Sequence, residues 1–437
     1  MLSFYQQLEK IFIRKKWLVF LLLIFLTFCF AIFSETKIAK ATMLEIVASG
    51  LDNPRRMAFG PDGALYVAEA GRGGLEPKII APELNSLLSL GSTGGVTRIQ
   101  NGTQKRVISE LPSLAILPEG NTTAPQEEGA VLSTVGPHDI GFDQTGKAYI
   151  LLGYASVLSQ RDILGSAGTD LSKLISYNVN ANGSWKKTDF SIDFLAFPEV
   201  YKLYNSVPGE DFLNNPYDLE VEGDTFSVVD AGGNNILTAD LAGNVSLQAG
   251  FPIEIVDNIQ LQPVPSSITK GPDGAFYVGE LGFSPEGNSR IYRITPGNDP
   301  EIFADGFTRI TGLDFDAEGN LYVLEYANQT QLSVPFGDNL NDFAGTLIQV
   351  SPDGTRRTLV APDEGLIAPN ALTVGPDGAL YVSNFTSVIG GGQVVRIDSR
   401  HSVSKRSPVL AVLGLGVLCI GSLRKYNWKA ADVVKKS

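Results

Sequence analysis

The amino-acid sequence predicts an all-β protein: a six-bladed β-propeller, closed by its N-terminal strand and flanked by two apolar terminal segments. Three observations predict this fold. A strand–turn–strand motif recurs six times in the 437 residues, and further short strands follow most of the copies. The chain also exceeds the roughly 250 to 300 residues that one hydrophobic core supports, a limit that repeats packing only on their neighbours avoid.

The clearest copy of the motif is residues 53–69, NPRRMAFGPDGALYVAE. Its two apolar strands are joined by a turn in which Pro61 fixes φ at about −65° and Gly63 tolerates a positive φ, as a tight hairpin requires. The other copies begin near residues 136, 215, 264, 310 and 368. Six copies predict six blades.

Third strands are expected at residues 95–99, 290–294, 346–350 and 393–397, and fourth strands at 106–108 and 358–360. Four strands are the unit of a propeller blade. The last copy ends at its third strand, whereas residues 44–47 look like a fourth strand with no blade before it. We therefore expect this N-terminal strand to complete the last blade and close the ring.

Both ends of the chain are expected to be targeting or anchoring segments. Basic residues precede an apolar run at 17–33, and Ala39-Lys40-Ala41 fits the small-x-small pattern of a cleavage site. We interpret residues 1–41 as a signal peptide or N-terminal membrane anchor, 42–398 as the propeller, and 399–437 as a linker with a C-terminal apolar anchor or sorting tail. The protein is thus expected to be exported to the periplasm, outer membrane or cell surface.

Charge and cysteine content narrow the function. The two tails hold 14 of the 34 basic residues but 3 of the 47 acidic ones, which leaves 20 basic and 44 acidic residues, a net charge of −24, in the propeller. Such a surface repels phosphate backbones, so nucleic acid is not an expected partner. Cys29 and Cys419 both lie in the tails, so the propeller has no disulfide and no thiol chemistry.

The long connections all fall before a first strand or after a second strand, which places them on one face of a propeller. Insertions collected on one face of a repeat protein indicate where it binds. The residues that flank the innermost strands on this face are Arg55, Arg56, His138, Asp139, Asn215, Tyr217, Asp218, Arg309 and Asn370 from the loops before first strands, with Glu69, Asp230, Asn234, Asn235, Glu280, Glu325 and Asn384 from the loops after second strands.

Carboxylates and amides dominate this set, which predicts an acidic mouth. Hard oxygen ligands suit calcium better than zinc or copper, and Glu69, Asn215 and Asp230 are the expected ligands of such an ion. The alternative interpretation is that these polar groups cap strand ends and solvate the channel without binding anything.

Histidine limits the acid–base chemistry. His401 lies in the linker, so any imidazole catalysis must use His138, paired with Asp139 or with a carboxylate of another blade. These two residues are the catalytic candidates, and a hydrogen-bonded turn histidine is the alternative. The chain has no Gly-x-Ser-x-Gly elbow and no Walker loop.

Several motifs resemble a known family. The segments GLDNPR at 50–55, GPHDI at 136–140, DAGGN at 230–234 and YVGEL at 277–281 are similar to those of the ScyD/ScyE family of exported bacterial propellers, named for the scytonemin pigment clusters of cyanobacteria. The resemblance covers about residues 44–398 and implies an exported six-bladed propeller without an established reaction. More distantly, the chain resembles NHL-like, gluconolactonase and strictosidine-synthase-like propellers. The tail at 408–425 resembles a degenerate PEP-CTERM sorting signal.

Three functions compete. The leading hypothesis is a binding or accessory protein of the cell envelope, whose partner is a small molecule, a glycan or an envelope protein and which the resemblance links to secondary metabolism or surface polymers. The alternative is a calcium-dependent lactonase or hydrolase. The second alternative is a quinone-dependent sugar dehydrogenase, which needs a channel base and cationic clamps that His138, Arg55, Arg56 and Arg309 could supply.

Overall fold

The computed structural model describes residues 40–41, 44–82, 86–117, 127–180, 183–200, 211–256, 259–282, 286–327, 340–399 and 403–404. The chain divides into two compact units, Thr42–His401 and a terminal unit of Met1–Ala41 with Ser402–Ser437. In the terminal unit, β1 (Lys40–Ala41) pairs antiparallel with β32 (Val403–Ser404). The predicted apolar segments at 17–33 and 408–423 lie outside the described residues. Among the helices within the described ranges, none is long and apolar enough to cross a membrane.

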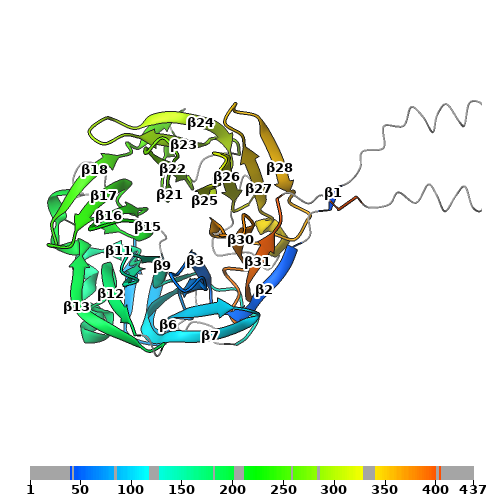
Figure 1. Ribbon diagram of the computed structural model, residues 1–437. Helices are drawn as coiled ribbons and strands as arrows, with labels where there is room; N and C mark the ends of the chain where they lie inside the picture. Colours follow the sequence, from blue (N-terminus) through cyan, green and yellow to red (C-terminus); the bar gives the residue numbers. More distant parts are fainter. Residues whose placement is uncertain are drawn as a thin grey trace, which may run out of the picture. The chain divides into compact units, whose positions relative to one another are not determined.

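Residues 42–401 form a β-propeller of antiparallel sheets arranged around a central axis (Figure 1). In the described part of this unit, six sheets contain four or more strands, and each runs from an inner strand to an outer one. In that order they are β3 (Pro54–Phe59), β4 (Leu65–Glu69), β6 (Ser86–Gln100) and β7 (Thr103–Ile116); β9 (Pro137–Phe142), β10 (Ala148–Leu152), β12 (Lys173–Val179) and β13 (Trp185–Asp193); β15 (Pro216–Glu222), β16 (Thr225–Asp230), β17 (Asn235–Asp240) and β18 (Val245–Gly250); β21 (Pro265–Lys270), β22 (Phe276–Glu280), β23 (Ser289–Ile294) and β24 (Glu301–Phe307); β25 (Ile310–Phe315), β26 (Leu321–Glu325), β27 (Thr346–Val350) and β28 (Arg356–Val360); and β29 (Leu372–Val374), β30 (Leu380–Asn384), β31 (Gly392–Ile397) and β2 (Leu44–Leu51).

The remaining elements extend the loops. Two short strands add to the first sheet, and two-stranded ribbons and 3-10 helices lie in the connections. They are β5 (Lys78–Ala81), β8 (Thr134–Val135), the pair β11 (Ser156–Val157) and β14 (Leu213–Asn214), the pair β19 (Glu254–Val256) and β20 (Ile259–Leu261), and the helices η1 (Leu158–Gly168), η2 (Phe194–Ala196), η3 (Pro198–Val200) and η4 (Leu340–Phe343).

The first strand of the propeller unit, β2, is the outer strand of the sheet that holds the last strands of that unit, β29, β30 and β31. Leu44 lies opposite Ile397, and Leu51 lies opposite Gly392. The strand expected at residues 44–47 thus exists, is longer than expected, and pairs with the third strand of the last copy of the repeat.

The large hydrophobic clusters join neighbouring sheets, and one of them spans three sheets through Leu88 of β6, Tyr149 of β10 and Phe226 of β16. Tyr66 of β4 packs with Ile140 of β9, for example, and Val229 of β16 packs with Ile268 of β21. A further cluster joins the sheet of β2 to the sheet of β3, through Leu51 and Met57. The core is therefore a series of interfaces between sheets, as expected for stacked repeats.

Three Pro-Asp-Gly turns, at residues 61–63, 272–274 and 376–378, lie between first and second strands, as predicted, and the one at 352–354 joins β27 to β28. In the turn after β3, Gly63 has φ of +71° and its N–H donates to the carbonyl of Gly60 at 2.9 Å. The Asp62 carboxylate accepts hydrogen bonds from the Tyr66 hydroxyl at 3.1 Å and from Arg98 Nε at 3.0 Å. Gly60 leaves room for this tyrosine, because a Cβ there would lie 2.5 Å from its ring. Hydrogen bonds of this turn thus connect β3, β4 and β6 of the same sheet.

Candidate functional site

Five of the innermost strands have a β-bulge near their second residue. In β9, Pro137 pairs with Leu152 and Asp139 with Leu151, so His138 is the extra residue. A bulge takes the extra residue out of the regular pleat and re-aims its side chain. The same shift occurs in β3, β15, β21 and β25, where the extra residues are one of Arg55 and Arg56, then Tyr217, Ser266 and Thr311.

The re-aimed side chains meet at the axis. The Tyr217 ring lies edge-on to the His138 ring, with 4.8 Å between centroids. The Nδ2 group of Asn370, just before β29, donates to the Tyr217 hydroxyl at 2.6 Å, a contact between residues 153 apart in sequence. Side chains from three sheets are therefore in contact where the inner strands begin.

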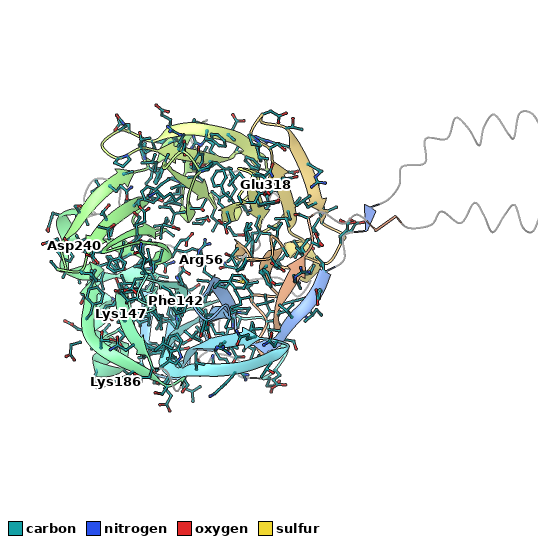
Figure 2. The ribbon with its side chains drawn as sticks, viewed as in Figure 1. Arg56, Phe142, Lys147, Lys186, Asp240 and Glu318 are labelled. Atoms are coloured by element: carbon teal, nitrogen blue, oxygen red, sulfur yellow. The ribbon has the colours of Figure 1, made fainter. Side chains whose placement is uncertain are left out.

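Arg56 crosses the axis, and Figure 2 shows it near the centre of the ring of sheets. Its Nη2 donates to the carbonyl of Thr311 at 2.8 Å and also to the carbonyl of Ser266. Its Nε lies 3.1 Å from Oδ1 of Asp218, and its guanidinium lies over the Tyr217 ring. One side chain from the sheet of β3 thus contacts three other sheets, and its charge is matched by a carboxylate.

Arg55, its neighbour, has different partners. Its Nη2 donates to the carbonyl of Thr134 and its Nη1 to the carbonyl of Thr386, at 3.4 Å. The side chain is buried and its Nε has no hydrogen-bond partner. Among the described residues, no carboxylate forms an ion pair with Arg55.

His138 is buried and uncharged. Burial, followed by the nearby Arg55 charge, lowers its pKa to about 3. Its Nδ1 lies 2.8 Å from the carbonyl oxygen of Pro216, which only accepts hydrogen bonds. Nδ1 must therefore carry the proton, and Nε2 is left as a hydrogen-bond acceptor.

The carboxylates of Asp139 and Asp218 lie close together, because both contact the backbone N–H of Leu219. Burial, and then the Asp218 charge, raise the pKa of Asp139 well above its usual value. Both carboxylates accept the N–H of Leu219 at 2.8 Å, and Asp218 also accepts the N–H of Ile268 at 2.6 Å. Burial thus favours the neutral form of Asp139, whereas Asp218 forms the ion pair with Arg56.

The carboxylates that close the second strands are buried and hydrogen-bonded, and the acidic mouth stays a prediction. Glu280 accepts hydrogen bonds from Arg290 Nε at 3.0 Å and the Tyr292 hydroxyl at 2.8 Å, both on β23. Asp230 and Glu325 accept backbone N–H groups from the loops that lead into their own sheets, as does the amide of Asn384. Buried acceptors require partners, and these side chains find them within their own sheet, away from the axis.

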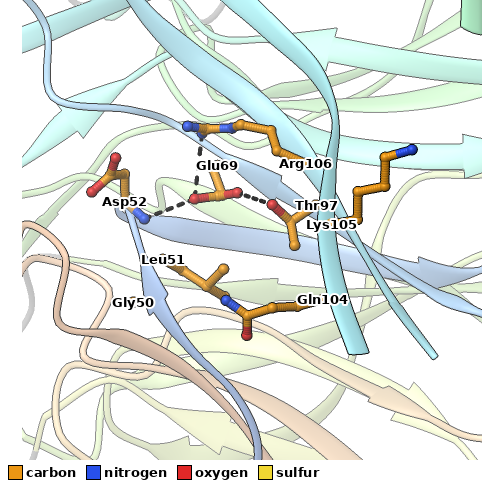
Figure 3. Close-up of a pocket in the computed structure, with 8 residues that line it drawn as sticks. All are labelled: Gly50, Leu51, Asp52, Glu69, Thr97, Gln104, Lys105 and Arg106. Atoms are coloured by element: carbon orange, nitrogen blue, oxygen red, sulfur yellow. Dashed lines mark hydrogen bonds and ion pairs between the residues drawn. The ribbon is translucent and has the colours of Figure 1, made fainter. Parts of the chain in front are cut away.

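Glu69 lines a small pocket of about 170 Å³ between β2 and the sheet of β3 (Figure 3). Its Oε2 accepts the N–H of Asp52 at 2.8 Å and lies 3.4 Å from Arg106 Nη2, and its Oε1 accepts the Thr97 hydroxyl. Burial raises the pKa of Glu69, and these partners oppose that rise. The side chain of Gln104 on β7 also connects to β2, because it accepts the N–H of Ser49 and donates to the carbonyl of Ser49.

The predicted calcium ligands are not gathered into one cluster. Asn215 donates its N–H to Asp230 at 2.7 Å, while the contacts of Glu69 are those of the pocket above. Within the described ranges, no group of three or more His, Cys, Asp or Glu side chains is arranged to hold a metal ion. The calcium site stays a prediction, and an ion there would have to replace these hydrogen bonds.

Asn234 and Arg309, two further residues of the predicted set, lie in loops just before β17 and β25. Asn234 and Arg309 both have positive φ, of 51° and 52°. Asn234 Oδ1 accepts the N–H of Val264 at 3.1 Å. Arg309 is buried, which lowers its pKa, near Tyr326.

Two features of the axis escaped the sequence reasoning. The carbonyls of Ser266 and Thr311 hold Arg56, and Tyr326 lies near both Arg55 and Arg309, with a pKa that burial raises to about 12. A shared position after each first-strand Pro was a usable signal, because Arg55, His138, Tyr217, Ser266 and Asn370 all occupy it.

Comparisons with known proteins give likenesses of fold. No protein-family model matches the chain, and no curated protein matches it in sequence. Among solved structures, the soluble aldose sugar dehydrogenase of Escherichia coli is 12% identical, with 82% of this chain and 100% of that chain covered and a TM-score of 0.47. A putative gluconolactonase is 13% identical over 82% and 92%, with a TM-score of 0.42. A streptogramin B lyase is 14% identical over 82% and 97%, with a TM-score of 0.39. Likenesses this low identify neither a reaction nor a ligand for this chain.

Proposed function

We propose that the protein is an exported, envelope-associated six-bladed propeller that binds a small molecule at the axis of its loop-rich face. The observation that carries the proposal is the convergence of Arg55, His138, Tyr217 and Asn370 from four sheets. Buried polar groups with unused hydrogen-bonding capacity are costly, and binding sites are where proteins keep them. Glycans and envelope proteins remain alternative partners on the surrounding loops.

The six sheets of four or more strands support the six blades of this proposal, and the pairing of β2 with β31 supports closure by the N-terminal strand. Deleting residues 42–50 should then lower the melting temperature far more than a surface trim such as Glu318→Ala. An unchanged melting curve would contradict closure.

The first and last strands of the propeller unit end close to one of the tight turns. Leu44 and Ile397 are paired, and Leu380, which follows a Pro-Asp-Gly turn, also pairs with Ile397. Both ends of the propeller therefore leave on the face of the tight turns.

Binding at the axis is tested by thermal unfolding of the purified full chain with a panel of polar metabolites. A true ligand stabilises the native state and raises the melting temperature. Tyr217→Phe removes the hydroxyl that Asn370 contacts and should reduce the shift, whereas Glu280→Gln should leave it unchanged. A ligand whose shift ignores both Tyr217→Phe and His138→Gln would place binding elsewhere.

A sugar dehydrogenase that uses a quinone is the second candidate, because His138 and Arg55 lie together at the axis. A quinone would supply the oxidising chemistry, and Arg55 is the residue that would donate hydrogen bonds to a quinone oxygen. Absence of quinone binding by fluorescence titration would remove this candidate.

The calcium-dependent lactonase stays an alternative prediction, which calorimetry with calcium on the full chain tests.

A further inference from the structure

We infer that the ligand of the axial site is a small hydroxycarboxylate, an organic acid that carries at least one hydroxyl group near its carboxylate. This inference rests on the proposed function, and it names the chemistry that the unused groups of the site require. Those groups are one cation and two hydrogen-bond acceptors.

The cation is Arg55, whose side chain is 6% exposed. Arginine stays charged in proteins, so a buried guanidinium needs a compensating charge or a full set of acceptors. Two carbonyls occupy two of its five N–H groups, and Nε is unpartnered. A carboxylate would supply both the missing charge and paired acceptors.

Arg56 is the internal comparison. It lies in the same strand and is buried to a similar degree, and its Nε likewise makes no hydrogen bond, yet the Asp218 carboxylate lies 3.1 Å from that Nε and two carbonyls accept from Nη2. The sequence thus supplies a carboxylate for one arginine of the pair. For Arg55, the charge remains to be supplied by a ligand.

The acceptors are Asn370 and His138. Asn370 is 3% exposed, its Nδ2 is used by Tyr217, and its Oδ1 has no hydrogen-bond partner. His138 presents Nε2 as an acceptor because Nδ1–H donates to Pro216. The Asn370 Oδ1 requires a donor and His138 Nε2 can accept one, and a hydroxyl group has a donor that a simple carboxylate lacks.

Two matched pairs of probes separate the two requirements. L-Lactate and propionate differ by a hydroxyl, and D-gluconate and D-sorbitol differ in charge. Calorimetry on the full chain in detergent should show that D-gluconate binds more tightly than D-sorbitol by about tenfold or more, the value of one hydrogen bond to a charged group. L-Lactate should bind more tightly than propionate by about threefold to tenfold, the value of one hydrogen bond between neutral groups.

Arg55→Gln keeps a donor but removes the charge, so it should weaken D-gluconate about tenfold and leave D-sorbitol unchanged. Asn370→Ala should abolish the preference for L-lactate over propionate. Arg55→Lys should restore part of the D-gluconate affinity. Arg396→Gln, on the face of the tight turns, is the matched control and should bind D-gluconate like the wild type.

The inference is overturned if no hydroxycarboxylate binds at millimolar concentration, if D-sorbitol binds as tightly as D-gluconate, or if Arg55→Gln leaves D-gluconate binding unchanged. A neutral ligand whose binding still depends on Tyr217 would overturn the ligand class while the proposed function stands. Binding that ignores Tyr217 and His138 altogether would sink the proposed function as well.

Discussion

The loop-rich face combines two sets of polar residues that the structure treats in opposite ways. Residues after second strands, such as Glu69 and Glu280, turn toward outer strands and loops and have several partners each. Residues at the start of first strands, such as Arg55 and Asn370, turn toward the axis and keep atoms without partners. A carboxylate at the end of a second strand thus stabilises its own sheet through hydrogen bonds. A polar residue at the start of a first strand keeps hydrogen-bonding groups that a ligand can use.

The largest expected effect is at the axis. Arg56→Met leaves Asp218 buried without its cation and two carbonyls without a donor. Breaking a buried ion pair from one side costs about 3–5 kcal/mol of unfolding free energy. Urea denaturation measures this loss, and Arg56→Met with Asp218→Asn should recover part of it. A double variant that is simply additive would show that the pair is not coupled.

A strand-end change should cost less and leave binding intact. Glu280→Gln removes the charge that accepts from Arg290, although Glu254 still contacts that arginine. The expected loss is about 1–3 kcal/mol in urea denaturation, with ligand affinity unchanged. Altered affinity would mean that the strand-end acids are part of the site after all.

The pH dependence isolates His138. Its pKa of about 3 in the folded protein lies below its unfolded value of 6.5. Between these two pH values the imidazole is protonated in the unfolded chain and neutral in the folded protein. Wild type should therefore lose stability relative to His138→Gln as pH falls from 6.5 toward 3, by about 1.4 kcal/mol per pH unit, with no relative change above 6.5. Asp139, Asp314 and Glu220, whose pKa values burial raises, contribute the opposite slope in both proteins and cancel in the difference. Parallel stability curves would show that His138 is not held neutral.

The smallest effect is expected on the face of the tight turns. Arg396 pairs with Asp377 at 2.7 Å, and both side chains are partly exposed. Arg396→Gln should change the unfolding free energy by less than about 1 kcal/mol, because exposed ion pairs contribute little. A loss as large as that of Glu280→Gln would show that the turns, and not only the strand ends, fasten the sheets.

Local patterns predicted the propeller well, because each rests on neighbours in sequence. The Gly60 to Gly63 turn, its tyrosine and the strand at residues 44–47 follow from turn chemistry and alternation. The direction of the polar side chains did not follow, since Glu69 and Asn370 both flank inner strands on the same predicted face. One finds partners in its own sheet, and the other reaches a tyrosine 153 residues away.

The sequence by itself determined the repeated β-sheet architecture and which residues lie on the loop-rich face, since hydrophobic period and tight turns are local properties. Only the tertiary structure decided which of these residues share the axis. Bulges turned His138 and Tyr217 inward, and packing between sheets far apart in the chain matched Arg56 to Asp218 while leaving Arg55 without a carboxylate. Charge pairing inside a protein depends on three-dimensional neighbours, and no repeat pattern specifies those.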